Sequence, residues 1–307
     1  MPDPVAVIDC GTNSVRLLVT DGAADLERRT TITRLGGGVD RTGRLDPAGI
    51  DRTVEVLAEY RRLVDQHGVD RMRFIATSAS RDATNRDEFF SRAEAAVGIE
   101  PELLSGDDEA AAAFAGATAG LDPSVGPFCV IDLGGGSTEF AIGATSLDQA
   151  MSLDMGSVRF TERYVESDPP QPEELVACLS VAEAHLLDVR LEMPAISDTG
   201  TFIGVAGTIT TMAAVEIGLI TYDPDRIHGF RLTRAAAEDV YRTLVTEPLE
   251  DRIHNPGLQA ERAEVIVGGS AIVVAIMRFF GIDELVVSER DLLDGLAAEL
   301  LAPSRPG

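Results

Sequence analysis

The chain opens with a run of apolar, β-branched residues that predicts a buried strand. Residues 5–9 read Val-Ala-Val-Ile-Asp, and residues 15–20 return as a second apolar segment after a turn of small and polar residues. Apolar runs bounded by turn residues are typical of strands buried within a sheet. A third strand is predicted near residues 31–35, so we expect three consecutive strands at the start of the chain.

Helices alternate with strands after this point. Residues 47–66 place apolar side chains at helical spacing, which predicts an amphipathic helix. The same half contains a predicted strand at 73–77, a helix at 85–97, a strand at 99–104 and a helix at 105–119. This alternation predicts an α/β domain.

The opening pattern returns after a linker at residues 121–127. Residues 6–14 align without gaps to residues 129–137, and both blocks have the form apolar-Ile-Asp-x-Gly-x-x-Ser. Each block also continues into a second apolar strand. We interpret the repeat, at an offset of 123 residues, as an ancestral domain duplication. It predicts two α/β domains, residues 1–124 and 125–307.

Helices dominate the rest of the second half. Gly268 and Gly269 are expected to interrupt the helix predicted over residues 260–280. We expect the last helix to pack back on the first domain. The other helices are predicted at 172–193, 209–217, 233–245 and 292–301, and a last strand is predicted at 285–288.

The charge balance limits the partners of the protein. The chain carries 51 acidic and 26 basic residues, all of the basic ones arginine, for a net charge of −25. A field of this sign repels nucleic acid and anionic membranes, so neither is expected as a partner. It also repels phosphate, so a phosphate site here would need backbone amides, a few arginines and a divalent cation.

The cysteines and the first residues indicate a cytoplasmic protein. Cys10, Cys129 and Cys178 are odd in number and form no Cys-x-x-Cys pair, which argues against a disulfide framework and a zinc ribbon. The first residues lack the basic region and apolar run of a secretion signal, and no stretch approaches the length of a membrane span. We therefore expect the protein in a reducing cytoplasm.

The repeated blocks carry the candidate chemistry. In the first Asp-Gly-Ser turn (residues 9–14) and the second (residues 132–137), an Asp at a strand end precedes a turn with Gly and Ser. Glycine lets backbone N–H groups approach phosphate oxygens, the hydroxyl adds a donor, and the Asp can hold magnesium through water. One such turn alone would be a tight hairpin, whereas a matched pair favours a phosphate site. Gly204-x-x-Gly207-Thr208 is a third candidate loop, although its glycines would equally suit close packing of a strand on a helix.

These motifs resemble the phosphate loops of the exopolyphosphatase/guanosine pentaphosphatase family. The matches follow the family order from residue 5 to about residue 300. The resemblance implies an α/β, duplicated actin-like (ribonuclease H-like) two-domain fold with an interdomain cleft. The further matching segments are residues 34–45, 76–85, 105–110, 204–208 and 261–269.

The resemblance also implies roles for acidic residues. Glu109 would be the general base that activates water for attack on the terminal phosphorus. From spacing alone, its turn would predict only a helix cap, because Ser105-x-x-Asp108 is a capping box. Asp132 matches a magnesium-associated aspartate, and Glu139 a second acidic position for activity or metal binding. Asp9 would support the ion from the opposite domain, and the expected metal is Mg2+ or Mn2+.

Phosphate contacts and cationic contacts are implied in the same way. The phosphate contacts would come from Asn13, Ser14, Gly135, Gly136, Ser137, Gly207 and Thr208, and the cationic ones from Arg16, Arg81 and Arg262. Arg16 and Arg262 would lie nearest a guanosine pyrophosphate. A single arginine is more often a solvated ion pair of little value, so these three rest on their motif positions.

The chain departs from the family at three points. Asp108 stands where the family usually has Glu, and Ala206 replaces a frequent Ser. Longer relatives carry a C-terminal helical domain that this sequence does not show, and grip on long polymers and a homodimer through that domain depend on it.

Several functions stay open at this point. The first is removal of the terminal phosphate from inorganic polyphosphate, with short chains as a preference. Its nearest rival is conversion of guanosine pentaphosphate to tetraphosphate. A catalytically weak sensor of alarmone or polyphosphate comes from a different class, and an ATP-dependent sugar kinase of the same superfamily is the third alternative.

Overall fold

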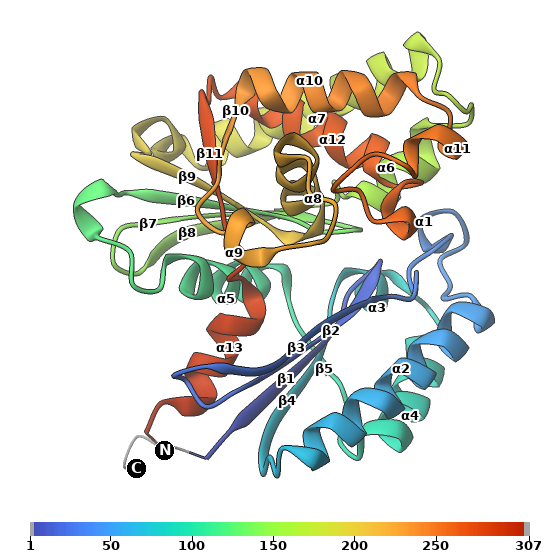
Figure 1. The fold of residues 1–307 in the computed structure, drawn as a ribbon, viewed down its shortest axis with the longest axis vertical. Coiled ribbons are helices and arrows are strands. Elements are labelled where there is room, and N and C mark those ends of the chain that lie inside the picture. Colours follow the sequence, from blue (N-terminus) through green and yellow to red (C-terminus); the bar gives the residue numbers. More distant parts are fainter. Residues whose placement is uncertain (1–2, 304–307) are drawn as a thin grey trace.

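A computed structural model describes residues 3–303 and contains two mixed β-sheets, one in each lobe of the molecule in Figure 1. The first sheet has the order β3-β2-β1-β4-β5. Its strands are β1 (Val5–Cys10), β2 (Ser14–Thr20), β3 (Asp25–Ile32), β4 (Arg71–Ala76) and β5 (Glu102–Leu103). The helices of this half of the chain are α1 (Val39–Thr42), α2 (Pro47–Gln66), α3 (Ser78–Asp82), α4 (Arg86–Val97) and α5 (Gly106–Thr118).

The second sheet has the order β10-β11-β9-β6-β7-β8. Its strands are β6 (Phe128–Leu133), β7 (Thr138–Gly143), β8 (Leu147–Leu153), β9 (Thr201–Val205), β10 (Arg231–Thr233) and β11 (Glu284–Val287). The helices of this half are α6 (Ser157–Tyr164), α7 (Pro172–Glu192), α8 (Ala206–Ile217), α9 (Pro224–Ile227), α10 (Arg234–Thr246), α11 (Leu249–Arg252), α12 (Ile266–Phe279) and α13 (Leu292–Leu301).

The two sheets repeat one topology. β1 pairs antiparallel with β2 and parallel with β4, and β6 pairs antiparallel with β7 and parallel with β9. In each sheet the third strand of the lobe, β3 or β8, extends the antiparallel edge. The predicted α/β, duplicated actin-like fold is therefore confirmed.

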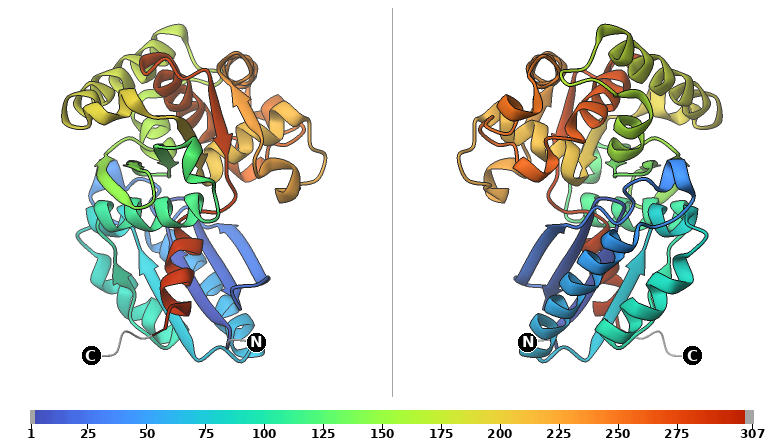
Figure 2. Two further views of the ribbon diagram at one scale, coloured as in Figure 1. Left: turned by 90° about the vertical axis from the view of Figure 1, so that its left-hand side faces the viewer. Right: turned by 90° about the vertical axis from the view of Figure 1, so that its right-hand side faces the viewer.

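Period-two alternation along β1 separates the two cores of the first lobe. Ala6 and Ile8 point into the core beneath α2 and α4, whereas Val5 and Val7 point to the opposite face. The opposite face is covered by α13, through Leu292, Leu293 and Leu296. Both side views in Figure 2 show α13, in red, in the lower lobe beside the blue strands.

Helices α5 and α13 cross between the sheets. Gly116 of α5 lies against the Asp291 carbonyl, and Gly295 of α13 lies against the Ala112 carbonyl. A Cβ on either glycine would overlap the facing backbone oxygen, so this close crossing requires glycine. Because α5 also packs on the second sheet through Phe114, the helix pair joins both lobes. The predicted boundary near residue 124 stays a prediction.

The strands that the sequence placed wrongly or missed all lie at sheet edges. β3 spans Asp25–Ile32 rather than residues 31–35, β5 is shorter than predicted, and β8 and β10 were not predicted. An edge strand has one neighbour and exposes polar side chains, so the apolar run that marks a central strand is absent.

Two helical predictions were also wrong. α12 continues through Gly268 and Gly269 without interruption, and residues 260–262 form a separate 3-10 turn. A Cβ on Gly268 would lie 2.6 Å from Thr161 Oγ1, so this glycine permits close helix packing instead of breaking the helix. α8 begins at Ala206 rather than at residue 209, and the helices that were not predicted are α1, α3, α6, α9 and α11. Within residues 3–303, no helix is long and apolar enough to cross a membrane.

Candidate active site

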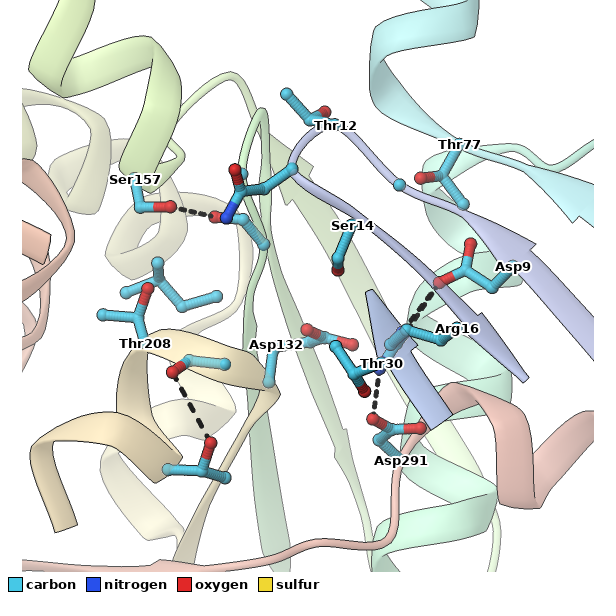
Figure 3. A pocket seen from close by; sticks show the side chains of 18 of the residues that line it. Asp9, Thr12, Ser14, Arg16, Thr30, Thr77, Asp132, Ser157, Thr208 and Asp291 are labelled. Carbon is cyan, nitrogen blue, oxygen red and sulfur yellow. Dashed lines mark hydrogen bonds and ion pairs between the residues drawn. The ribbon is translucent and has the colours of Figure 1, made fainter. Parts of the chain in front are cut away.

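A cleft between the two lobes brings the repeated turns together (Figure 3). It is lined by both Asp-Gly-Ser turns, by the first turn of α8 and by the segment that precedes α13. All but two of the predicted site residues line it: Asp9, Asn13, Ser14, Arg16, Glu109, Asp132, Gly135, Gly136, Ser137, Gly207, Thr208 and Arg262. The exceptions are Arg81 and Glu139, which lie behind residues of the lining.

The glycines of the second turn let the two turns touch. A Cβ on Gly135 would lie 2.9 Å from the Thr12 Cβ of the first turn, closer than real Cβ contacts. Gly136 is confined more tightly still, since a Cβ there would lie 2.3 Å from Ser78 Oγ and 2.8 Å from Thr12 Oγ1. The glycines therefore serve the close approach of the lobes as well as exposing backbone N–H groups to a ligand.

Strand register places the charged residues of the turns in equivalent positions. Asp9 lies directly opposite Arg16 in the β1–β2 ladder, and Asp132 lies directly opposite Glu139 in the β6–β7 ladder. Arg16 and Glu139 are separated by the same 123 residues as Asp9 and Asp132. The duplicated site thus has an ion pair in one copy and two carboxylates in the other.

The carboxylate pair is buried and repulsive. Asp132 is 6% exposed and Glu139 is 1% exposed. Burial raises the pKa of Asp132 to about 8, and the Asp291 and Glu109 charges add to the effect against the opposing Arg16. Burial also raises the pKa of Glu139, with the Glu109 and Asp132 charges next in size. Like charges directly opposite each other in a ladder are destabilising, and either protonation or a bound cation would relieve the repulsion.

The donor atoms fit a hard divalent cation. Glu139 Oε1 accepts a hydrogen bond from Ser152 Oγ at 2.7 Å, while the buried Glu139 Oε2 and Asp9 Oδ1 have no hydrogen-bond partner among the described residues. Within residues 3–303, no group of three or more His, Cys, Asp or Glu side chains is placed to hold a metal ion by itself. Mg2+ commonly uses one or two carboxylates with waters and substrate phosphates, which suits such an open set of oxygens.

Arg16 neutralises the first turn. Its Nε and Nη2 donate to Asp9 Oδ2 at 2.9 Å and 2.7 Å. Its Nη1 donates to Asp291 Oδ2, which comes from the other end of the chain. Burial raises the pKa of Asp9 and the Arg16 charge opposes that shift. Figure 3 shows Arg16 between the two aspartates, with Asp132 facing them from the second turn.

Glu109 lies in the first turn of α5. This turn is capped by Ser105 and also borders the cleft. Ser105 Oγ accepts the Asp108 N–H at 3.2 Å, as expected for an N-cap. The Glu109 side chain is buried at the cleft, and Arg81 Nη1 donates to its Oε2 at 2.8 Å. Arg81 also donates to the Leu104 carbonyl, so it holds Glu109 from behind. Burial raises the pKa of Glu109, and the Arg81 charge partly offsets this.

The third loop opens α8 and presents an arginine. Ala206 has a φ of 69°, which is strained for a residue with a side chain. Gly207 lies under the Arg262 guanidinium, and a Cβ there would overlap it. Arg262 Nε donates to Gln259 Oε1 at 2.9 Å, and within residues 3–303 the guanidinium has no carboxylate partner. Burial lowers the pKa of Arg262, the expected response of a cation without a counter-ion.

Asp291 and Arg159 are among the residues of this region that sequence reasoning missed. Asp291 lines the cleft and pairs with Arg16, and its only local signal was the cap pattern Asp291-x-x-Asp294 before the last helix. Arg159 of α6 donates to the Gly136 carbonyl at 2.8 Å and to Asp40 at 2.6 Å. Nothing local in the sequence distinguishes Arg159 from the other arginines.

Comparison with known proteins identifies the family of the chain. The model of the Ppx/GppA phosphatase family matches residues 17–303. Exopolyphosphatase 2 of Mycobacterium tuberculosis is 39% identical over 96% of this chain and 98% of its own. The guanosine-5'-triphosphate,3'-diphosphate pyrophosphatase of Aeromonas hydrophila is 30% identical over 96% of this chain and 59% of its own.

Solved structures give the same result. A crystal structure of an exopolyphosphatase-like protein has a TM-score of 0.93 at 34% identity, covering 96% of this chain and 98% of the other. The Ppx-GppA enzyme of Aquifex aeolicus has a TM-score of 0.79 at 36% identity, covering 96% and 99%. With the family model, the relatives and the duplicated cleft in agreement, the chain belongs to the Ppx/GppA phosphatase family.

Proposed function

We propose that the protein is an exopolyphosphatase that removes the terminal phosphate from inorganic polyphosphate, short chains included. Membership of a phosphatase family makes it a hydrolase, and its relatives are named for the hydrolysis of phosphoric anhydrides. The observation that carries the proposal is Glu109, a buried carboxylate that borders the cleft shared by both Asp-Gly-Ser turns. Phosphoryl transfer needs such a positioned carboxylate next to a cradle of phosphate donors.

Each part of the lining has a task in this reaction. The backbone N–H groups of both turns, with the hydroxyls of Ser14 and Ser137, would bind the terminal phosphate. Glu109 Oε1 or Oε2 would accept a proton from the attacking water. The water oxygen then forms the new P–O bond, the bond to the bridging oxygen breaks, and that oxygen leaves with the shortened chain. Arg262 would neutralise phosphate charge from the α8 side.

A divalent cation belongs to the same proposal. Asp132 and Glu139 would hold Mg2+ or Mn2+, with Asp9 close by, and the cation would neutralise charge on the phosphoryl oxygens. The support is the repulsive, buried carboxylate pair and its unpartnered oxygen.

The cleft lining favours an inorganic chain over a nucleotide. Tyr222 is the one aromatic residue among the described residues of the lining, and its hydroxyl is bound to Glu289. A nucleobase is usually held by aromatic or apolar surface, which this lining offers sparsely. Guanosine pentaphosphate is the second candidate substrate, because the Aeromonas relative is named for it. A sensor without turnover is disfavoured by the presence of Glu109, Asp132 and Glu139. Cytoplasmic location and a homodimer stay predictions.

Phosphate release from polyphosphate and from guanosine pentaphosphate, with Mg2+ or Mn2+, tests the proposal. Glu109→Gln should lose at least about a hundredfold in kcat, the scale of a general base. Its matched control is Asp107→Asn, an exposed carboxylate in the same helical turn, which should keep its activity. Release of phosphate from neither substrate would refute the proposal, and near-normal turnover by Glu109→Gln would refute the assigned base.

A further inference from the structure

Asp291 places a second carboxylate on an arginine that already has one. Arg16 borders the cleft with 17% of its side chain exposed. Asp9 Oδ2 accepts from its Nε and Nη2, and Asp291 Oδ2 accepts from its Nη1. A charge-assisted bond to Asp9 alone would leave both N–H groups of Nη1 available to a ligand, so Asp291 takes one of these donors and adds a second negative charge beside Arg16.

Asp291 is held firmly in this position. Its Oδ1 accepts the Leu293 N–H at 2.9 Å, and its own N–H donates to Asp294 Oδ2 at 2.9 Å, which together cap α13. Asp294 in turn accepts from Arg28 Nη2 at 2.6 Å. The Asp291 carbonyl packs on Gly116 of α5. A ligand would therefore have to break a braced contact to displace Asp291 from Arg16.

The other arginines of the cleft show what this pairing changes. Arg28 is occupied by Asp25 and Asp294. Arg262 has no carboxylate partner within residues 3–303. The described lining thus offers one unmasked guanidinium, on the α8 side, whereas the side of Arg16 carries net negative charge from Asp9 and Asp291. One free guanidinium is enough to contact the phosphates of a single linear chain.

We propose that Asp291 is a specificity-determining residue that masks Arg16 from substrate phosphate. The masked cleft favours a linear phosphate chain and disfavours a nucleotide that carries two separate phosphate groups, since the second group finds a carboxylate where it needs a cation. The inference rests on the proposed function of the cleft as a phosphate-chain site. The inference names the Asp291–Arg16 contact as the feature by which the cleft would discriminate between polyphosphate and guanosine pentaphosphate.

Helix capping alone does not account for an aspartate here. The cap uses Asp291 Oδ1, and Asn or Ser would supply an equivalent cap oxygen. The second carboxylate oxygen and the negative charge serve only the contact with Arg16. Asp291→Asn therefore keeps the cap and removes the mask, and Asp291→Ser is a second variant with the same property.

The experiment compares two probes in a background that cannot turn them over. Titration calorimetry with Glu109→Gln would give the Kd of inorganic tripolyphosphate and of guanosine 5'-triphosphate 3'-diphosphate, with and without Asp291→Asn. We expect the preference for the guanosine ligand over tripolyphosphate to rise about tenfold, the effect of one charge-assisted hydrogen bond. In the otherwise unchanged enzyme, the ratio of the two kcat/KM values should shift in the same direction.

Two control variants distinguish the effect of the Asp291–Arg16 contact from the effect of removing any negative charge. Asp283→Asn removes one exposed carboxylate paired with Arg234 and should leave the ratio unchanged. Adding Arg16→Gln to Asp291→Asn should cancel the shift. An equal gain for both ligands, or no gain, would overturn the proposal. If the unmodified enzyme released phosphate from neither substrate, the proposed function would fail, while the Kd ratio would still decide whether Asp291 masks Arg16.

Discussion

Asp132 and Glu139 face each other across the β6–β7 ladder, at the positions that an Asp–Arg ion pair occupies in β1–β2. In the first copy opposite charges face each other across the ladder, whereas in the second copy two carboxylates do. Buried like charges weaken the fold, and carboxylates with strongly perturbed pKa values cluster at functional sites. This asymmetry is the reason for proposing the cation beside Asp132, in the second lobe, rather than symmetrically between the lobes.

The first prediction concerns stability and pH. Burial raises the pKa of Asp132 from 3.8 to about 8, so its stabilising contribution is complete below pH 4 and is lost as the pH rises through 8. In EDTA, the Tm should fall between pH 6 and pH 9. Asp132→Asn should flatten this fall and raise the Tm at pH 9 by roughly 5 °C. Differential scanning calorimetry measures both.

Asp132→Asn should keep part of the pH dependence of the Tm, because the pKa of Glu139 is raised as well. Mg2+ added at pH 9 should restore the Tm of the unmodified protein and have little effect on Asp132→Asn. Asp107→Asn, which alters an exposed carboxylate, is the charge control. An identical fall of Tm with pH in Asp132→Asn and the unmodified protein would contradict the prediction.

The second prediction concerns the pH dependence of the reaction. Arg81 lowers the pKa of Glu109 against the opposing effect of burial. Arg81→Gln should therefore raise that pKa further, and a protonated Glu109 cannot accept a proton from water. The acid limb of kcat/KM should move to higher pH, with activity recovering at alkaline pH. Steady-state rates across pH 5–10 test this.

Arg73→Gln is the control for this variant, since Arg73 pairs with Glu102 and Glu299 away from the cleft lining. A loss of activity by the same factor at every pH would show that Arg81 acts on geometry and not on the Glu109 charge.

The third prediction assigns Arg159 a positioning role. This α6 residue donates to the Gly136 carbonyl of the second turn and to Asp40 and Asp82 of the first lobe. Arg159→Met keeps the volume and removes these bonds. The KM should rise about tenfold, with a smaller change in kcat, because the second turn loses its brace.

The neighbouring Arg163 offers a matched control for this experiment. It also pairs with Asp40, at 2.8 Å, but it is more exposed and donates no hydrogen bond to Gly136. Arg163→Met should leave KM nearly unchanged. Equal effects of the two variants would mean that the Asp40 ion pair matters and the Gly136 contact does not.

The fourth prediction tests the helix crossing. In an open helix, Gly→Ala would stabilise by about 1 kcal/mol. At Gly116 the added Cβ would overlap the Asp291 carbonyl, which is backbone and cannot swing away. Gly116→Ala should therefore lower the free energy of unfolding by about 1–3 kcal/mol. Urea unfolding measures it, and Ala115→Gly on the exposed side of α5 calibrates the propensity difference. A stabilised Gly116→Ala would contradict the close crossing.

The central strands and the long helices were predictable because their signals are local. β1 and β6 are buried on both faces and read as unbroken apolar runs, and α2 has the expected bounds, Pro47–Gln66. The edge strands β3 and β8 carry polar residues and gave no such signal. Gly268 and Gly269 misled the helix prediction, since their reason for being glycine is a neighbouring helix that sequence spacing cannot reveal.

The amino-acid sequence alone was enough to predict the duplication and the groups that would contact phosphate, because each Asp-Gly-Ser turn is encoded within about ten consecutive residues. It could not tell how each acid is neutralised. Arg16 and Asp291 are 275 residues apart, and they meet only because α13 returns to the first sheet and crosses α5. Charge pairing depends on distances across the cleft, and those are set by the packing of the two lobes.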